Sequence, residues 1–380
     1  MQKHLMSTKQ INKNISDKKR VQKTNKRVFV GMSGGVDSSV TAALLQKEGY
    51  DVVGVFMKVW EPDFLPCTWR AERLDAIRVA AHLGIPLLTW DFEKEYKQGV
   101  ADYMIREYRT GRTPNPDVMC NREVKFGAFF NRAIKEGADF VATGHYARVS
   151  HDKKNNQFVM LAGIDASKDQ SYFLWTIGQK QLSKTILPIG AYKKSQVRAL
   201  AKKFALPTAE KKDSQGLCFV GKLDMKDFLA HFMEEKRGMV LDGKGEVIGH
   251  HRGAFFYTLG ERHGFTITAK GTLDDAYYVV AKDIPANTIT VGKKDGAQAA
   301  LSARKTIVLT ETNYCRGEIL KEGTNYTAAI RYHGELYPCV VLGATKESCT
   351  LAFKHPVVVA AGQSVVIYNN DECLGGGVVV

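Results

Sequence analysis

The chain lacks any apolar run that approaches the ~20 residues needed to cross a bilayer. The stretch before Val28 also lacks the apolar core of a secretory signal. It is rich in lysine and asparagine, whereas mitochondrial transit peptides are rich in arginine and serine. These absences argue against membrane insertion and export, and they predict a cytoplasmic protein. Hydrophobic content of 44% and charged content of 25% are typical of globular proteins.

Cysteines are few, and none is spaced as a C-x-x-C pair. The count is seven, an odd number, in a chain of 380 residues that needs no disulfide staples. The spacing gives no support to a zinc ribbon or a simple iron–sulfur site, and we predict no protein-held metal cluster. A reducing compartment is predicted. We interpret most of the cysteines as small buried apolar residues, namely Cys67, Cys315, Cys339, Cys349 and Cys373.

Acidic residues do not balance the basic ones. The net charge is +14 at neutral pH. Nine lysines and arginines before Val28 face a single aspartate, so about half of the excess lies in this tail, which we expect to be a disordered extension. The rest belongs to the folded body. A basic body is compatible with a polyanionic partner such as nucleic acid.

Strand and helix patterns alternate through the first half of the chain. Such alternation predicts a parallel sheet with helices on both faces, and loops at the carboxyl ends of its strands should build the site. Strands are predicted at 27–32, 51–57, 86–90 and 140–143, and helices at 39–47, 74–83, 100–108 and 124–135.

The pattern changes after about Leu223. Glycines recur at short intervals and helical periodicity is weak, which predicts short strands and turns. We therefore divide the chain into a basic tail (1–26), an α/β domain (27–222), a small β-rich domain (223–296) and a C-terminal β-barrel (297–380).

A glycine loop follows the first predicted strand, and its core reads Ser33-Gly34-Gly35-Val36-Asp37-Ser38. Glycines let an anion approach the backbone N–H groups at the start of a helix. The Walker pattern is absent, so no lysine of that kind holds a transferring γ-phosphate. Asp37 would repel phosphate unless Mg²⁺ lay between them.

Two cysteines lie in unusual local sequences. The first is in Asn115-Pro116-Asp117-Val118-Met119-Cys120-Asn121-Arg122 and the second in Asp213-Ser214-Gln215-Gly216-Leu217-Cys218-Phe219. If Asp117 caps the following helical turn, its side chain and Cys120 share one face. The second segment contains glycines on both sides of the cysteine, which predicts a loop. A cysteine in a loop is not expected to be a buried packing residue.

The loop, the two cysteine segments and the domain order resemble the tRNA-specific 2-thiouridylases of the PP-loop ATP pyrophosphatase superfamily. The resemblance runs from about Arg27 to the C-terminus and includes Ala142-Thr143-Gly144-His145-Tyr146, Lys168-Asp169-Gln170 and Ala361-Gly362-Gln363-Ser364. The basic tail is not covered. The segment 61–70 follows the family pattern only loosely, so the role of Cys67 stays open.

The resemblance implies a sulfurtransferase that uses Mg-ATP to adenylate O2 of the wobble uridine (position 34) and then replaces that oxygen with sulfur. Cys218 would carry a persulfide, Cys120 would be the second thiol, and Asp117 the general acid/base. Whether free hydrosulfide or the bound persulfide attacks C2 stays open. The resemblance places ATP at Gly31, Met32, Ser33, Gly34, Gly35, Val36, Asp37, Ser38, Met57 and Gly144. It places tRNA at Asn115, Pro116, Asp117, His145, Lys168, Asp169, Gln170, Arg331, Tyr332 and Gln363.

The implied partners are tRNAs for Lys, Glu and Gln and a persulfide donor, either a cysteine desulfurase or a sulfur carrier. Two alternatives remain open at this point. One is another PP-loop ligase or synthetase that acts on a small molecule and does not need the paired cysteines. The other is a tRNA- or persulfide-binding protein without activity. Oligomeric state is not predicted.

Overall fold

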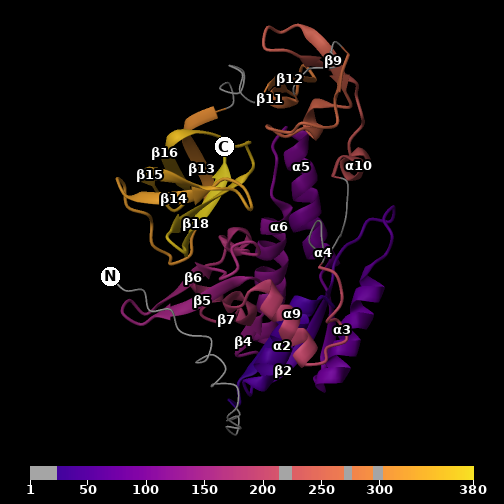
Figure 1. Ribbon diagram of the computed structural model, residues 1–380, viewed down its shortest axis with the longest axis vertical. Coiled ribbons are helices and arrows are strands. Elements are labelled where there is room, and N and C mark those ends of the chain that lie inside the picture. The colour runs from indigo at the N-terminus through magenta and orange to yellow at the C-terminus, as the bar shows by residue number, and fades with distance from the viewer. Residues whose placement is uncertain (1–23, 214–224, 269–275, 294–302) are drawn as a thin grey trace.

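The computed structural model describes residues 24–213, 225–268, 276–293 and 303–380. Figure 1 shows three parts: an α/β domain that contains the N-terminal half, a small β-rich domain beyond α5, and a barrel that carries the C-terminus. Among the described residues, no helix combines the length and the apolar character that a membrane span requires.

The N-terminal domain is built on a parallel sheet with strand order β3-β2-β1-β4-β7. Val30 of β1 lies opposite Gly54 of β2 and Ala142 of β4. The loops that follow β1 and β4 therefore leave the same edge of the sheet side by side. The strands are β1 (Arg27–Gly31), β2 (Asp51–Lys58), β3 (Leu87–Asp91), β4 (Phe140–Ala142) and β7 (Thr185–Ile186).

Helices cover both faces of this sheet because successive side chains of each strand point to opposite faces. Val28 and Val30 pack into one apolar cluster with residues of α2, α3 and α9, while Phe29 packs into another with residues of η1 and η2. The helices are α2 (Val36–Lys47), α3 (Trp69–Leu83), α4 (Glu93–Tyr96), α5 (Tyr103–Arg109), α6 (Pro116–Met119), α7 (Phe130–Lys135), α8 (Gln179–Leu182) and α9 (Lys194–Lys203), with the π-helical η1 (Lys97–Asp102) and η2 (Cys120–Phe129) and the 3₁₀ turns η3 (Ser171–Leu174) and η4 (Pro188–Ala191).

The C-terminal strands close into a barrel. Their order is β13-β16-β15-β14-β17-β18, and a further pairing of β13 with β18 joins the two ends. Closure leaves no exposed sheet edge among these strands. Their bounds are β13 (Ala303–Tyr314), β14 (Asn325–Ala329), β15 (Leu336–Ala344), β16 (Ser348–Val358), β17 (Ser364–Asn369) and β18 (Glu372–Val379).

A hairpin of the N-terminal half extends the barrel sheet. It consists of β5 (Ala147–Asp152) and β6 (Gln157–Ala162), and Leu161 of β6 pairs with Glu372 of β18. Arg148 reinforces the joint by donating to Asp371 at 2.7 Å. The N-terminal half and the barrel are thus connected by backbone pairing as well as by side chains.

The central domain has a small sheet of order β10-β9-β8-β12-β11, in which β8 and β12 are parallel and the other pairs antiparallel. Its apolar cluster includes Met104 and Tyr108 of α5, so that helix ties it to the N-terminal domain. The elements are α10 (Met225–Ala230), β8 (Gly238–Leu241), β9 (Val247–His251), the 3₁₀ turn η5 (Ala254–Phe256), β10 (Thr266–Ile267), β11 (Tyr277–Asp283) and β12 (Thr288–Lys293).

The fold class predicted from the sequence is confirmed: a parallel α/β domain, a small β-rich domain and a C-terminal barrel. Two local expectations are wrong. Cys67, which was predicted to be buried, is exposed. Asp117 does not cap the helix that leads to Cys120, because Asn115 is the N-cap and accepts a hydrogen bond from the Val118 backbone N–H at 3.2 Å. Pro116 occupies the first helical position, where its missing N–H costs nothing.

Candidate active site at the phosphate loop

The glycine loop lies where predicted, between β1 and α2. Gly34 has φ +71°, and a Cβ there would lie 2.2 Å from the Glu72 carbonyl oxygen in the first turn of α3. Only glycine fits this position. Gly35 is the N-cap of α2, so the unpaired N–H groups of the first helical turn face the loop. Ser38 Oγ binds back to the Gly35 carbonyl at 3.2 Å and holds the loop closed.

The Gly144-His145 loop packs directly against this loop. A Cβ on Gly144 would lie 2.8 Å from the Ser38 nitrogen and 2.9 Å from the Asp37 carbonyl carbon. Met57, at the end of β2, lies over Gly31, where a Cβ would be 2.9 Å from its Cε. The structure therefore brings together the segments at which the family resemblance places ATP.

His145 is buried and does not face solvent. Its Nδ1 is 2.7 Å from Thr143 Oγ1 and its Nε2 is 3.5 Å from Lys125 Nζ. Burial lowers the pKa of His145 well below its ordinary value, and the nearby Lys125 charge adds to the effect. A lysine ammonium can only donate, so the neutral ring carries its proton on Nδ1. This histidine links the phosphate loop to η2, the helix that begins at Cys120.

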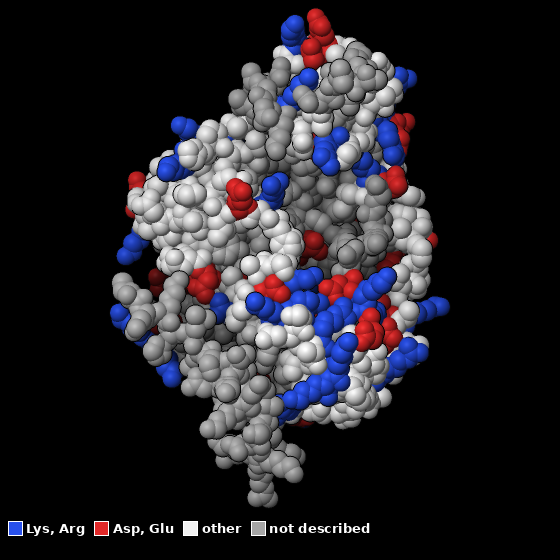
Figure 2. Space-filling view, viewed as in Figure 1, with Lys and Arg blue, Asp and Glu red and all other residues white. Residues whose placement is uncertain are grey.

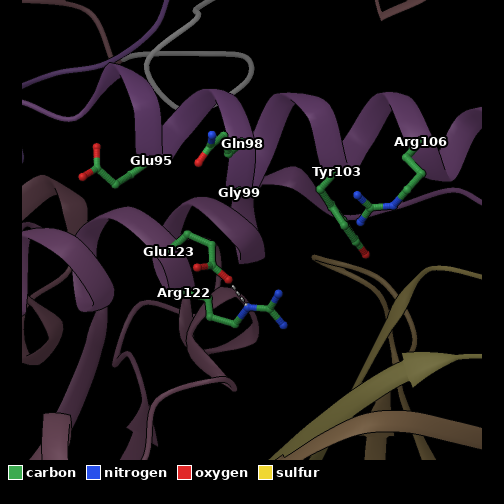
Figure 3. A pocket seen from close by; sticks show the side chains of 7 residues that line it. All are labelled: Glu95, Gln98, Gly99, Tyr103, Arg106, Arg122 and Glu123. Carbon is green, nitrogen blue, oxygen red and sulfur yellow. Dashed lines mark hydrogen bonds and ion pairs between the residues drawn. The ribbon is translucent and has the colours of Figure 1, made fainter.

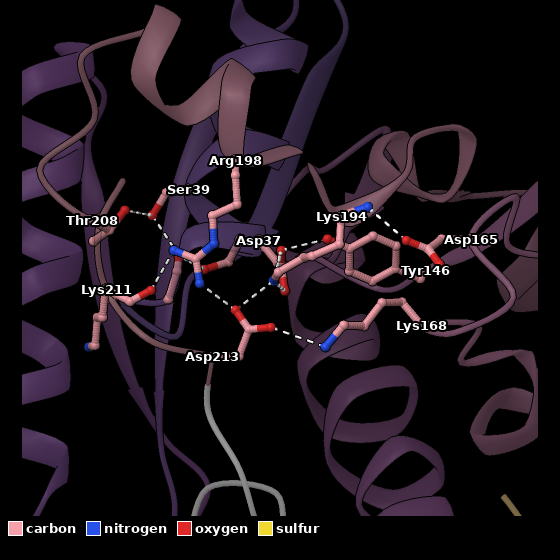
Figure 4. A network of polar contacts seen from close by, with 12 residues as sticks. Asp37, Ser39, Tyr146, Asp165, Lys168, Lys194, Arg198, Thr208, Lys211 and Asp213 are labelled. Carbon is pink, nitrogen blue, oxygen red and sulfur yellow. Dashed lines mark hydrogen bonds and ion pairs between the residues drawn. The ribbon is translucent and has the colours of Figure 1, made fainter. Parts of the chain in front are cut away.

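Asp37 is held by two side chains that the motif does not contain. Lys194 Nζ, at the start of α9, lies 2.8 Å from each Asp37 carboxylate oxygen, and the Tyr146 hydroxyl donates to Asp37 Oδ1 at 2.8 Å (Figure 4). Burial raises the pKa of Tyr146, and the Asp37 charge raises it further, so the phenol stays protonated.

Lys194 also forms an ion pair with Asp213. Lys194 Nζ is 2.9 Å from Asp213 Oδ1, Lys168 Nζ is 3.1 Å from Oδ2, and Arg198 donates to Oδ1 (Figure 4). A further lysine, Lys211, donates to the Gly34 carbonyl at 3.1 Å. Asp213 is the last described residue before 214–224, so Cys218 lies outside the described residues. Asp213 itself, where this described range ends, is fixed beside the phosphate loop through Lys194.

Asp213 makes a testable contribution to acid stability. Burial alone would raise its pKa, but hydrogen bonds and charge from Lys194 and Lys168 outweigh burial and lower the pKa from 3.8 to about 2. A depressed carboxylate pKa stabilises the fold above the unfolded value, and this contribution is lost as pH falls from about 4 to about 2. The shift corresponds to roughly 2 kcal/mol. We expect the difference in unfolding free energy between wild type and Asp213→Asn to shrink across this window in urea titrations.

The control for this experiment is Glu210→Gln, whose carboxylate is 83% exposed in its pair with Lys202. It should run parallel to wild type at every pH. A constant gap between wild type and Asp213→Asn from pH 4 to pH 2 would contradict the assignment.

Asp117 and Cys120 lie on consecutive turns of α6 and η2. Cys120 is fully buried and Asp117 is partly exposed. Asn121 Nδ2 donates to the Asp117 carbonyl at 3.0 Å, while its buried Oδ1 finds no hydrogen-bond partner among the described residues. Leaving a buried acceptor unpaired costs about 1–3 kcal/mol.

An aromatic cluster flanks Asp117. Tyr332 packs on Phe173 with ring centroids 4.2 Å apart and stacks on His333 at 3.8 Å. Burial raises the pKa of Tyr332 to about 12, and the Asp169 and Asp117 charges raise it further, so the phenol stays protonated. Arg331 beside it is exposed. Exposed bases of single-stranded RNA stack on surfaces of this kind.

Other residues assigned to tRNA are engaged within the protein. Asp169 accepts from the Gly163 backbone N–H at 2.7 Å and from Ser171 Oγ at 2.8 Å. Gln170 Oε1 accepts from the Tyr146 N–H at 3.0 Å, and Gln363 Nε2 donates to the Thr113 carbonyl at 2.9 Å. These contacts give each side chain a role in holding the fold, whatever it contributes to RNA binding.

An open cavity of about 360 Å³ lies between η2 and the continuous helix formed by η1 and α5 (Figure 3). None of the residues that line it belongs to the phosphate loop. Arg122 in its wall donates to Glu123 at 2.7 Å and to Glu311 of the barrel at 3.1 Å. The Arg122 guanidinium is thus paired with two carboxylates.

Basic side chains gather on the face that carries α9. Figure 2 shows Lys and Arg mixed with Asp and Glu over the lower half of this view, where α2 and α9 lie in Figure 1. Lys194, Arg198 and Lys211 are the functional candidates that sequence reasoning missed. Nothing in their local sequence separates them from other lysines and arginines, because only the fold brings them to Asp37 and Asp213.

A glycine phosphate loop at the edge of a parallel sheet, an N-terminal α/β domain and two following β domains define a nucleotide-using enzyme with appended β modules. Residues 26–222 match the family described as tRNA methyl transferase HUP domain. Residues 226–293 match the tRNA methyl transferase PRC-barrel domain and residues 304–379 the aminomethyltransferase beta-barrel domain.

Three curated relatives narrow this class. The tRNA-specific 2-thiouridylase MnmA of Enterococcus faecalis (strain ATCC 700802 / V583) is 44% identical over 357 residues, which cover 93% of this chain and 95% of that protein. The protein of the same name from Ralstonia nicotianae is 44% identical and covers 94% and 96%, and that from Bacillus cytotoxicus is 43% identical and covers 93% and 94%. The chain belongs to the tRNA-specific 2-thiouridylase family.

Proposed function

We propose that this enzyme, a tRNA-uridine 2-sulfurtransferase, converts uridine at the wobble position of tRNA to 2-thiouridine at the expense of ATP. Uracil O2 attacks the α-phosphorus of ATP and pyrophosphate leaves, which turns a poor leaving group into AMP. Family membership supports the use of ATP and tRNA. The observation that carries the mechanism is the connection of the phosphate loop to both cysteine segments.

That connection has two arms. Through Gly144 and His145 the loop contacts η2, which begins at Cys120. Through Lys194 the loop is bonded to Asp213, five positions before Cys218. Five residues of chain span at most about 18 Å. Chain connectivity therefore supports a role for both thiols beside the same nucleotide.

Sulfur transfer then follows by one of two balanced routes. In one, the terminal sulfur of a Cys218 persulfide attacks C2 and expels AMP, and the Cys120 thiolate attacks the Cys218 sulfur to release 2-thiouridine. In the other, Cys120 attacks first and frees hydrosulfide, which displaces AMP. Both routes end with a Cys120–Cys218 disulfide that an external thiol must reduce. Asp117 moves the protons at the reacting atoms.

The donor set does not fit a resident Mg²⁺ at Asp37. Both carboxylate oxygens lie 2.8 Å from the Lys194 ammonium, and the described residues contain no group of three or more side chains that could hold a metal. The lysine already supplies the positive charge that the sequence argument sought in a metal. Mg²⁺ is therefore proposed only as the counter-ion that enters with ATP on its phosphates, and no step of the mechanism is assigned to it.

Incubation with unmodified tRNA, Mg-ATP and a persulfide source tests the proposal. Mass analysis of the digested tRNA should show 2-thiouridine, with one AMP and one pyrophosphate formed for each sulfur incorporated. tRNAs for Lys, Glu and Gln are the proposed substrates, and the sulfur donor is a cysteine desulfurase or a sulfur carrier. AMP formed on a small-molecule acceptor without 2-thiouridine would instead identify another ligase of the superfamily.

Gly144→Ala tests the ATP site itself. The added Cβ would lie 2.8 Å from the Ser38 nitrogen, so the phosphate loop must move away from the position that cradles phosphate. We expect the KM for ATP to rise about tenfold or more, since small displacements of a binding loop have large effects. Gly343→Ala, where a Cβ meets no atom within 4 Å, is the matched control. Equal KM values for the two variants would contradict ATP binding beside Gly144.

A further inference from the structure

Thr113 is the point at which all three domains meet. Its backbone N–H donates to the Ala361 carbonyl of the barrel at 2.8 Å, and its own carbonyl accepts from Gln363 Nε2 at 2.9 Å. Its hydroxyl lies 3.0 Å from the Thr258 hydroxyl of the central domain. Thr113 is 5% exposed. A loop of the catalytic domain is thus fixed by two other domains.

The barrel turn that holds Thr113 is itself fixed. It connects β16 to β17, and Gly362 at its tip has φ +89°. A Cβ on Gly362 would lie 3.0 Å from both the nitrogen and the oxygen of Thr113. The Gly362 N–H donates to the Val379 carbonyl and the Val379 N–H to the Gln363 carbonyl, each at 2.9 Å. The turn therefore presents the Gln363 amide from a rigid strand pair.

Thr113 leads directly into the proposed catalytic segment. Asn115 caps α6, Asp117 follows two residues later, and Cys120 begins η2. Pro114 and Pro116 restrict the backbone between Thr113 and Asp117, because each proline ring fixes φ. A displacement of the Thr113 carbonyl is consequently passed on to Asp117 rather than absorbed by a flexible loop.

We propose that Gln363 is a positioning residue for the sulfur-transfer reaction. Its amide sets the place of Asp117 and Cys120 through the Thr113 carbonyl, and this role does not require a contact with tRNA. The proposal rests on the proposed function of those two residues. It differs from the sequence-based prediction, which treats Gln363 as a tRNA contact alone, and the two roles affect different measured quantities.

Gln363→Met separates the two roles because it keeps the length of the side chain and removes the donor without adding charge. We expect the single-turnover rate of 2-thiouridine formation at saturating tRNA to fall about 10–100-fold, the effect of a small misplacement of reacting groups. The Kd for tRNA, measured by filter binding without ATP, should stay at the wild-type value, because the amide is bound to the Thr113 carbonyl of the protein itself. A higher Kd with an unchanged rate at saturation would overturn the proposal.

Three further measurements keep the test decisive. Gly362→Ala disturbs the same turn through the backbone and should lower the same rate. Asn369→Ala, exposed at the far end of β17, should match wild type in both quantities. Amide hydrogen exchange of residues 113–120 should quicken in Gln363→Met while β1 stays protected. Unchanged exchange in residues 113–120 would overturn the positioning role of Gln363. Absence of 2-thiouridine in the wild-type reaction would instead count against the proposed function, and the exchange measurement would still test the positioning role.

Discussion

Cys218→Ser is expected to abolish 2-thiouridine formation, with a loss of at least about 10³-fold, while tRNA-dependent release of pyrophosphate persists. A serine hydroxyl cannot carry a persulfide, and covalent catalysis by a cysteine depends on the thiolate. The adenylation step uses only the phosphate loop and uracil O2, so it does not need sulfur. Cys120→Ser should give the same loss in multiple turnover, since the Cys120–Cys218 disulfide cannot form.

The measurement pairs nucleoside mass analysis with a pyrophosphate assay on the same reaction. Cys349→Ser and Cys339→Ser are poor controls, because both thiols are buried in the barrel core. Cys67→Ser is the better control, since its side chain is exposed. Full thiolation by Cys218→Ser would remove the persulfide mechanism and favour a ligase that acts on another acceptor.

Short motifs of consecutive residues could be assigned to the site from the sequence alone. The phosphate loop, the Gly144-His145 loop and the Asn115–Cys120 segment each carry a local signature, and parallel strands bring the first two to one sheet edge. Strand patterns likewise predicted β1, β2, β3 and β4 of the parallel sheet and the β-rich character of the C-terminal region. These features follow from local residue patterns, which sequence reasoning can detect.

The features that were missed are long-range. The β5–β6 hairpin pairs with β18, more than 200 residues away in sequence, and its pattern does not reveal its partner. Lys194 and Lys211 became functional candidates only when the fold placed them beside Asp37 and Gly34. Gln170 and Gln363 were assigned to RNA, yet both amides bind backbone groups within the protein. A side chain's partner depends on tertiary packing, which a single sequence does not display.

Lys194→Met is expected to weaken ATP binding by about 30–100-fold. Lys194 Nζ lies within 2.9 Å of oxygens of both Asp37 and Asp213, and its side chain is only 14% exposed. Removing Lys194 leaves Asp37, which is 30% exposed, as an uncompensated negative charge beside the proposed triphosphate site. Two unit charges about 6–8 Å apart at an effective dielectric constant near 20 repel by about 2–3 kcal/mol, and each 1.4 kcal/mol is about tenfold in affinity.

The direction of this effect distinguishes a binding role from a structural one. Without Lys194, the Asp37 carboxylate keeps only the Tyr146 hydroxyl and lies beside the proposed triphosphate site, where its negative charge repels ATP. Lys202→Met is the matched control on the same helix, since its pair with Glu210 is 63% and 83% exposed and such pairs contribute little. Lys194→Arg should recover part of the affinity. If Lys194→Met unfolds at lower urea than Lys202→Met but binds ATP equally well, the lysine only joins Asp37 to Asp213. If the Kd for ATP rises while the Kd for tRNA does not, Lys194 supplies the positive charge that lets Asp37 lie beside the triphosphate.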